Sequence, residues 1–397
     1  MSRALSGNHS TGKITASGSY AGGLFGCIEC YLWVQHEIED SYSLGDVEAL
    51  SGSYAGGFAG DIIIFYADTS LTIRDCYAKS RVSAESYAGG FVGEVLADRG
   101  AITINDCYAT GNVTASTVYS YAGGFIGSLY ARLGSGSITV SDCYSQGDVS
   151  GDGAIGGWTG SIDTQDTCTI DISLCHSIGR VVNSNSDRAG GWVGYIDDNS
   201  GGVTVAKCFS TGNVEGGNGN FVGGFAGEID AHSVSKCFSR GNASSTADWV
   251  AGFAGQFKGG SLTDCYSRGS AEGNDYVASF VGQMWGNLAN CYATGKVVGA
   301  DTDVGGLVAF WSAGVVSNSF WDKDASGQSS SAGGDGKTTI NLKQRQLFTD
   351  AGWDFVATWA ISPVCNYGYP ALRGVTPGAC DVANPILEKL VFQGAET

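Results

Sequence analysis

Short apolar runs separated by glycine, asparagine, aspartate and serine recur along most of the chain. One run is the heptad YAGGFVG, which begins at Tyr87 and belongs to a set of ten related copies between Tyr20 and Asp303. Most copies are followed by an aliphatic run that leads into a Cys-Tyr pair and then a Gly-x-Val run, as in ITINDCYATGNV, which ends at Val113. Runs of this length between turn-forming residues are typical of β-strands. The pattern therefore predicts about three short strands per unit and no helix within the repeats.

The distance between successive copies gives the size of the repeating unit. The copies start 33 or 34 residues apart six times and then 27 or 28 residues apart three times, so the later units lack five or six residues of one loop. A unit of this size cannot bury its apolar face alone, whereas units stacked in parallel bury a continuous core. A propeller blade needs four strands and about 40–45 residues. We therefore predict an all-β fold, a parallel β-solenoid (β-helix) of about ten turns.

The chain divides into three predicted parts. Residues 1–316 form the solenoid, residues 317–374 form a small C-terminal cap, and residues 375–397 form a linker and a tail strand. In the cap, Thr338 or Thr339 is suited to begin a short helix that runs to about Asp350. The cap is needed because the last turn would otherwise expose unpaired strand edges. The first residues read as the end of a unit, so the N-terminal turn is predicted to be open.

Stacking places equivalent residues of successive units in columns. The aromatic position of the heptad accepts Phe, Trp and Leu, which share only bulk and apolarity, so we expect it in the core. This column consists of Leu24, Phe58, Phe91, Phe125, Trp158, Trp192, Phe225, Phe253, Phe280 and Leu307.

A second column holds eight of the 13 cysteines, namely Cys76, Cys107, Cys143, Cys175, Cys208, Cys237, Cys265 and Cys291. The outer units have Ser41 and Ser319 at this position, and parallel strands rarely orient neighbouring side chains for bridging. We therefore expect a buried ladder of free thiols. Strict alternation would put Ile104 and Cys107 on opposite faces, so a bulge or corner between these two residues is expected.

Charge narrows the range of partners. The chain has 39 acidic and 21 basic residues, which gives a formal net charge of −18 at pH 7. Such a field repels phosphate backbones and anionic membranes, so nucleic acid is not an expected partner. No run of about 18 apolar residues is present, and membrane insertion of this segment is therefore not expected either.

No catalytic, cofactor-binding or metal-binding residues are predicted. The sequence lacks the HExxH, GxSxG and phosphate-binding glycine-lysine patterns. Cys27 and Cys30 form a CxxC without a second ligand pair. The segment DKDASG, Asp322 to Gly327, spaces oxygen ligands like half of a calcium loop, but Gly333 stands where a bidentate glutamate is required. We therefore do not expect an enzyme.

A glycan-acting β-helix enzyme, a lyase or a hydrolase, is the alternative. The carboxylates recur once per turn, and regular recurrence indicates a structural role. A cluster of carboxylates with a basic residue in a groove on one turn would instead favour the enzyme. The column Tyr20, Tyr54, Tyr87 and Tyr121 either packs at a corner or stacks on sugar rings.

The heptad followed by (N/D)-(C/S)-Y-(A/S)-x-G-(N/D/K)-V resembles the GLUG motif, which occurs in tandem in large bacterial surface proteins, including adhesins. The segments SNSFWDKDASG, LFTDAGWDF and YGYPALRG are similar to the tail that commonly closes such arrays. The resemblance implies an extracellular location on the bacterial cell surface and a structural or adhesive role. It also implies a glycan or another host-surface or cell-surface ligand, and it supplies no catalytic residues.

Two hypotheses concern the C-terminal region. Cys365 and Cys380 lie outside the repeats, 15 residues apart, where a structural disulfide and hence an oxidising compartment are plausible. The tail strand has no repeat to join, so Ile386, Leu390 and Phe392 are candidates for strand donation to a second copy. Such head-to-tail contacts would build a filament. The competing hypothesis is that both ends are cuts in a longer adhesin.

Overall fold

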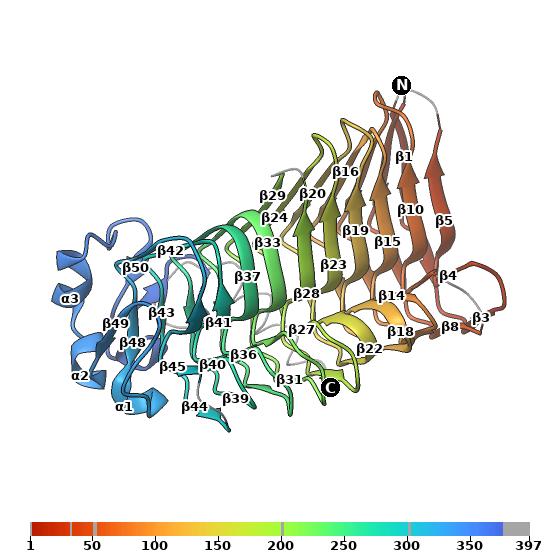
Figure 1. Cartoon of the computed structure of the whole chain (residues 1–397). Helices are drawn as coiled ribbons and strands as arrows, with labels where there is room; N and C mark the ends of the chain where they lie inside the picture. The colour runs from red at the N-terminus through yellow and green to blue at the C-terminus, as the bar shows by residue number, and fades with distance from the viewer. Residues whose placement is uncertain (1, 32–33, 51–53, 200–201, 301–302, 376–397) are drawn as a thin grey trace.

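The computed structural model describes residues 2–31, 34–50, 54–199, 202–300 and 303–375. Figure 1 shows parallel strands stacked turn upon turn from the N-terminal end to a group of short helices near the C-terminal end. Every strand pairing within the described repeats is parallel, from β1 (Ser2–Ser6) with β6 (Gln35–Glu39) to β42 (Asn287–Ala289) with β47 (Val316–Ser317). The predicted all-β parallel β-solenoid is confirmed.

One turn illustrates how the sequence builds the repeat. The heptad splits at its two glycines into β14 (Tyr87–Gly89) and β15 (Val92–Ala97). The aliphatic run forms β16 (Ala101–Asn105), and the Cys-Tyr run forms the short β17 (Tyr108–Ala109). The Gly-x-Val run begins β18 (Val113–Gly123), which opens the next turn. In the preceding unit the Gly-x-Val run forms a separate strand, β13 (Val82–Ala84). The predicted three strands per unit are therefore five, because the Gly-Gly corner divides the heptad and a second corner separates the aliphatic run from the Cys-Tyr run.

The strand after the Gly-Gly corner forms one continuous ladder with one strand for each heptad copy in the described residues. Its members are β5 (Phe25–Cys30), β10 (Ala59–Ile64), β15, β19 (Ile126–Ala131), β23 (Thr159–Thr164), β28 (Val193–Asp198), β33 (Ala226–Ser235), β37 (Ala254–Thr263), β41 (Val281–Met284) and β46 (Val308–Trp311).

The loop lost from the later units lies beside this ladder. In the earlier turns a loop separates the two strands that follow the corner, as between β28 and β29 (Val203–Ala206). In β33 and β37 the two strands are fused into one strand of 10 residues each. Thr204 lies seven positions after Asp197, but their partners Asp230 and Ser233 are only three positions apart, so four of the five residues lost at this step come from this loop. The fifth is lost between the Gly-x-Val strand and the next heptad, so the predicted loss from a single loop is only partly right. The N-terminal turns are the larger ones in Figure 1.

The heptad aromatic column lies in the core, as predicted. From Phe58 to Leu307 its side chains are fully buried, and the rings stack on one another. Trp158 and Trp192 are 4.9 Å apart between ring centroids with an angle of 2° between their planes. Phe91 and Phe125 stack at 5.0 Å and 3°. The column therefore forms an aromatic ladder along the solenoid axis.

The cysteine column is buried and unbridged, as expected. All eight of its thiols are free and 0% exposed. The backbone turns sharply just before each of them: Asp106 has φ +54°, in the left-handed region, and the Cys107 thiol donates to the Asn105 carbonyl at 3.2 Å. This corner turns Cys107 into the core and confirms the predicted interruption of alternation. Asp and Asn tolerate such a φ better than most residues.

The same left-handed corner recurs at Asp40, Asp75, Asp106, Asp142, Leu174, Lys207, Lys236, Asp264, Asn290 and Asn318.

The cap contains three short helices, α1 (Lys323–Ser326), α2 (Thr339–Leu342) and α3 (Arg345–Asp350). Thr338 caps α2 by accepting a hydrogen bond from the Asn341 amide at 3.3 Å. The single helix predicted from Thr338 or Thr339 to Asp350 is therefore two helices, because the chain leaves the helical path at Lys343 and Gln344.

The DKDASG segment, Asp322 to Gly327, holds the cap together through hydrogen bonds. The fully buried Asp322 carboxylate accepts hydrogen bonds from the Asp324 and Ala325 amides at 3.0 Å, which begins α1. It also accepts from the hydroxyls of Thr339 at 2.8 Å and Tyr369 at 2.7 Å. Asp322 thus ties three segments of the cap together.

Cap side chains cover the outer face of the last Cys-Tyr strands. Tyr292 is fully buried there, and its hydroxyl donates to the Pro370 carbonyl at 2.5 Å. The Trp359 indole donates to the Asp264 carboxylate at 3.1 Å.

Candidate functional site

The tyrosines that begin the first heptads line the outside of the Gly-Gly corner. They lie on β4 (Tyr20–Gly22), β9 (Tyr54–Gly56), β14 and β18. Successive ring centroids from Tyr20 to Tyr121 are 5.4, 4.6 and 5.1 Å apart. Neighbouring rings therefore cover both faces of Tyr54 and Tyr87. This geometry favours corner packing over the stacking of sugar rings at these two positions.

A row of acidic side chains lies beside these tyrosines. Asp61 on β10 and Glu94 on β15 stand opposite each other in register, and only 1% and 9% of their surfaces are exposed. Burial raises the pKa of Asp61 to about 7 and that of Glu94 to about 8, and the nearby charges of Glu29 and Asp61, respectively, add to the effect. Asp61 Oδ1 has no hydrogen-bond partner among the described residues. At neutral pH this pair therefore holds protons that ordinary carboxyls would have lost.

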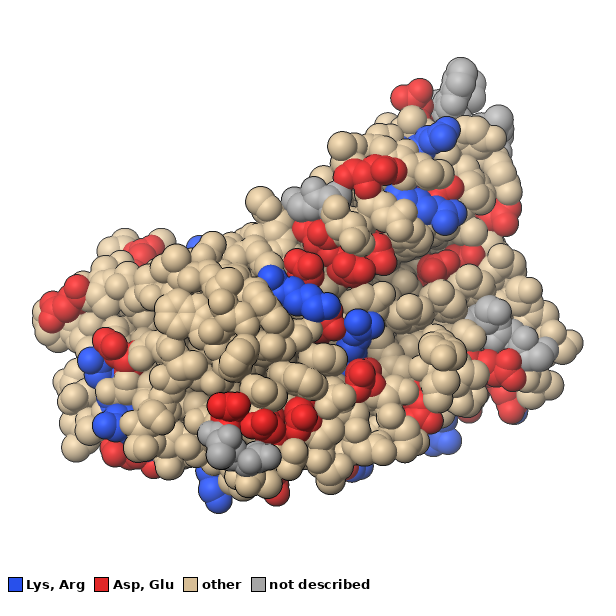
Figure 2. Space-filling model, viewed as in Figure 1, with Lys and Arg blue, Asp and Glu red and all other residues tan. Residues whose placement is uncertain are grey.

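Further along the same ladder, charged side chains concentrate. Asp163, Asp197 and Asp230 lie in register on β23, β28 and β33. Burial, and then the charge of Asp197, raises the pKa of Asp163 to about 6. Figure 2 shows acidic side chains gathered in a hollow in the middle of this face, with basic side chains beside them.

The basic side chains there are held by one buried carboxylate. The Glu228 side chain is only 5% exposed and pairs with Arg188 at 2.7 Å and also with Lys258. The Arg188 guanidinium lies over the Tyr195 ring at 4.7 Å from its centroid. Carboxylates and basic residues thus meet here, but they come from neighbouring turns, whereas the arrangement named above for an enzyme lies on one turn. Arg188 and Lys258 are also both paired with Glu228.

The turn after Val113 carries an outward bulge. The register between β18 and β22 (Val149–Gly156) shifts between Ala115 and Ser120. The extra residues bulge outward, so that Val118 is 54% exposed and Tyr119 is 87% exposed.

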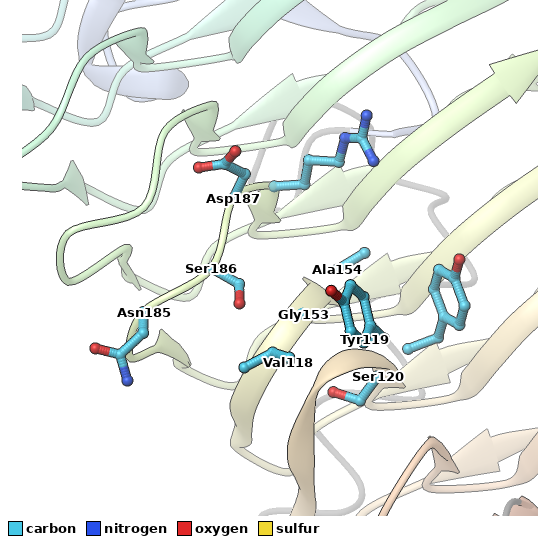
Figure 3. A pocket seen from close by; sticks show the side chains of 10 residues that line it. Val118, Tyr119, Ser120, Gly153, Ala154, Asn185, Ser186 and Asp187 are labelled. Atoms are coloured by element: carbon cyan, nitrogen blue, oxygen red, sulfur yellow. The ribbon is translucent and has the colours of Figure 1, made fainter.

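This bulge forms one wall of an open pocket of about 440 Å³. Figure 3 shows Val118 and Tyr119 on one side, Gly153 and Ala154 between the walls, and Asn185, Ser186 and Asp187 on the other side. Ser120, Tyr121 and Arg188 complete the lining, and Arg188 connects the pocket to the charged network.

The facing wall is held in place by hydrogen bonds. The Asn185 amide group donates to the Asp152 carboxylate at 3.3 Å, and the Asp187 carboxylate accepts from the Asn220 backbone amide at 2.8 Å. The segment that forms this wall is therefore partly fixed before any ligand arrives.

A glycine is required beneath the bulge. Gly153 has φ +135°, and a Cβ atom placed on it would lie 2.2 Å from the Ser120 carbonyl oxygen.

Motif-based reasoning missed this pocket, although the sequence contains a signal for it. Tyr121 lies eight positions after Val113, whereas in the other units the heptad begins five to seven positions after the equivalent residue, as Tyr87 does five positions after Val82. This difference predicts an insertion on the turn after Val113. Nothing in the sequence, however, indicates that the insertion would face the segment at 185–188.

The CxxC cysteines lie on one strand, β5. Cys27 and Cys30 are both free, and burial raises the pKa of Cys27 to about 12, which keeps the thiol protonated. In the described residues, no group of three or more His, Cys, Asp or Glu side chains is placed to hold a metal ion. Cys365 is buried and disulfide-bonded. Its predicted partner Cys380 lies outside the described residues, so the pairing stays a prediction.

The tail residues Ile386, Leu390 and Phe392 also lie outside the described residues, and strand donation stays a prediction. Across the described part of the chain, no helix has the length and apolar character needed to cross a bilayer.

Comparison with known proteins gives two matches. Residues 84–114 match the family model of the GLUG motif. A stretch of 81 residues is 41% identical to a putative Gly-rich membrane protein of Evansella cellulosilytica; it covers 19% of this chain and 9% of that protein. No solved structure matches. The matched residues span the end of one solenoid turn and most of the next, from β13 (Val82–Ala84) into β18. The chain therefore carries the GLUG motif as a turn of a parallel β-solenoid.

Proposed function

We propose that this chain is a non-enzymatic adhesive module of a bacterial surface protein. In this proposal the solenoid is a rigid rod, and the pocket beside the β18 bulge is the surface that contacts a ligand. The GLUG motif and the β-solenoid fold support a role in a repeat surface protein. The similarity to a putative membrane protein supports an association with the cell envelope.

The observation that carries the proposal is the exposure of Tyr119. An aromatic side chain that is 87% exposed does not stabilise the core, and it lies beside an open pocket on the surface of the solenoid. Exposed apolar groups next to polar ones are typical of interaction sites. An adhesive role also fits the rigidity of a continuous parallel ladder, which holds such a site at a fixed place.

Adhesion of the purified chain tests this proposal. Beads coated with the chain should bind to a glycan-bearing cell surface or a printed glycan array, and the eluted glycans should be uncleaved. Beads coated with Tyr119→Ala should bind less. No binding to either surface by the wild-type chain would contradict the adhesive function.

The buried pair Asp61 and Glu94 supports a second candidate function, that of a glycan-cleaving enzyme. The two carboxyls stand on adjacent strands, and Glu94 is the more exposed of the two, at 9% against 1% for Asp61. The pKa of Glu94, about 8, suits a group that donates a proton at neutral pH. Incubation with oligosaccharides followed by mass spectrometry tests it. Cleavage by the wild-type chain that is lost in Asp61→Asn and Glu94→Gln would establish the enzyme and overturn the non-enzymatic proposal.

A further inference from the structure

We propose that the pocket formed by Tyr119, Asn185, Ser186 and Asp187 binds a pyranose unit of a glycan that carries no acidic group. The inference rests on the proposed adhesive function and names the chemical class of its ligand. It is carried by four features of the pocket: a free aromatic face, a polar wall, the local charge and the size.

The ring of Tyr119 has a face that a ligand can contact, whereas the rings of Tyr54 and Tyr87 are covered by their neighbours. Tyr54 and Tyr87 are stacked between neighbours at 4.6–5.4 Å, whereas Tyr119 is 87% exposed and has no ring partner among the described residues. The C–H groups on one side of a pyranose ring form an apolar patch, and the electron-rich face of an aromatic ring attracts such groups. Tyr119 can therefore supply the stacking surface that the regular column lacks.

The opposite wall offers the groups that bind sugar hydroxyls. Asn185 contributes an amide, Ser186 a hydroxyl and Asp187 a carboxylate, which together donate and accept hydrogen bonds. The hydrogen bond from the Asn220 amide engages one oxygen of Asp187 and leaves acceptor capacity on the carboxylate. A ligand with several adjacent hydroxyl groups matches this set better than an apolar or a purely ionic ligand.

The charge around the pocket excludes acidic sugars. Asp187 lines it, and Asp152 lies directly behind Asn185. The one cation in its lining, Arg188, is paired with the buried Glu228 carboxylate. With a net charge of −18 on the whole chain, a uronate or a sulfated sugar would meet a negative field and no free cation in the lining.

The volume of about 440 Å³ falls within the roughly 300–1,000 Å³ usual for small-ligand sites. Because the pocket is open to solvent, the rest of a glycan chain can extend outward from the bound unit.

Calorimetric titration with defined hexasaccharides tests the proposal. The probes are hexamers of glucose, of N-acetylglucosamine and of galacturonate, and the proteins are the wild type, Tyr119→Ala, Asn185→Ala and Tyr66→Ala. We expect a non-acidic hexamer to bind at least tenfold more tightly than the galacturonate hexamer. Tyr119→Ala and Asn185→Ala should each weaken that binding at least tenfold. Tyr66 is a matched control, because it is 45% exposed but lies outside the pocket, and Tyr66→Ala should bind like the wild type.

Different failures have different meanings. A preference for the galacturonate hexamer, or unchanged binding by Tyr119→Ala, would overturn the assignment of this pocket. If coated beads adhere to cells but no hexamer binds, the pocket proposal fails and the adhesive function stands. If the beads do not adhere either, both fail.

Discussion

The aromatic ladder and the bulged turn show opposite uses of aromatic side chains in one solenoid. Trp158 belongs to a column that recurs in each heptad copy, and it is 0% exposed between Phe125 and Trp192. Tyr119 belongs to an insertion in β18 and is 87% exposed. The recurring residue is explained by packing alone, whereas the inserted residue has no packing role. The comparison teaches that in this repeat protein the periodic positions stabilise the fold, while interruptions of the period are the places to look for binding.

The largest loss of stability should come from truncating one side chain of the aromatic ladder. Trp158→Ala removes a fully buried ring and leaves a cavity between Phe125 and Trp192, which should lower the free energy of unfolding by about 3–5 kcal/mol. Trp158→Phe should cost much less, because phenylalanine occupies the same column on other turns. Urea denaturation followed by circular dichroism measures both. An effect of Trp158→Ala below that of Trp158→Phe would show that the column does not carry the stability.

The buried carboxyl pair should make stability depend on pH. The pKa values of Asp61 and Glu94, about 7 and 8, lie above their ordinary values near 4, so the folded chain keeps protons that the unfolded chain loses. Stability should therefore fall by several kcal/mol as the pH rises from about 4 to 8, because the unfolded chain releases both protons at a lower pH than the folded chain does.

The double variant Asp61→Asn, Glu94→Gln isolates this contribution. This variant should lose less stability than the wild type between pH 4 and pH 8, and it should be more stable than the wild type at pH 8. Melting temperatures across this pH range provide the measurement, and an unchanged slope in the double variant would assign the pH dependence to other groups.

The same comparison explains which features of the structure can be predicted from the sequence. The solenoid, the core aromatic column and the corner before Cys107 are predictable because each recurs, and recurrence reveals which positions are equivalent. The split of the predicted cap helix at Lys343 is not predictable from its capping residues, because packing against the last turns decides it. The pocket depends on contacts between Tyr119 and residues near Asp187, and no local pattern encodes such a pairing.

The glycine beneath the bulge should tolerate no side chain. Gly153→Ala would place a Cβ atom 2.2 Å from the Ser120 carbonyl oxygen at φ +135°, which should cost about 1–3 kcal/mol and displace the bulge. Gly134→Ala is the matched control, because Gly134 has φ +92° but nothing within 4 Å of the added atom. Equal losses for the two variants in urea denaturation would mean that backbone strain alone, and not the contact with the bulge, is responsible.

The smallest effect on stability should come from the exposed tyrosine. Tyr119→Ala removes a side chain that is 87% exposed, so the free energy of unfolding should change by less than about 0.5 kcal/mol. The urea midpoint gives this value directly. A loss comparable to that of Trp158→Ala would show that Tyr119 has a packing role after all.

The central claim is that the inserted residues of β18 bind a ligand, whereas the repeated positions stabilise the fold. Deleting the inserted residues tests this claim most directly. Deleting residues 117–119 makes the tyrosine of the next heptad the fifth residue after Val113, as Tyr87 is the fifth residue after Val82. We expect the shortened chain to keep its circular dichroism spectrum and its melting temperature within a few degrees, because the regular turn at Val82 shows that this spacing folds. Its binding to immobilised non-acidic glycan, measured by surface plasmon resonance, should be lost. Binding that equals the wild type in the folded deletion variant would contradict the account.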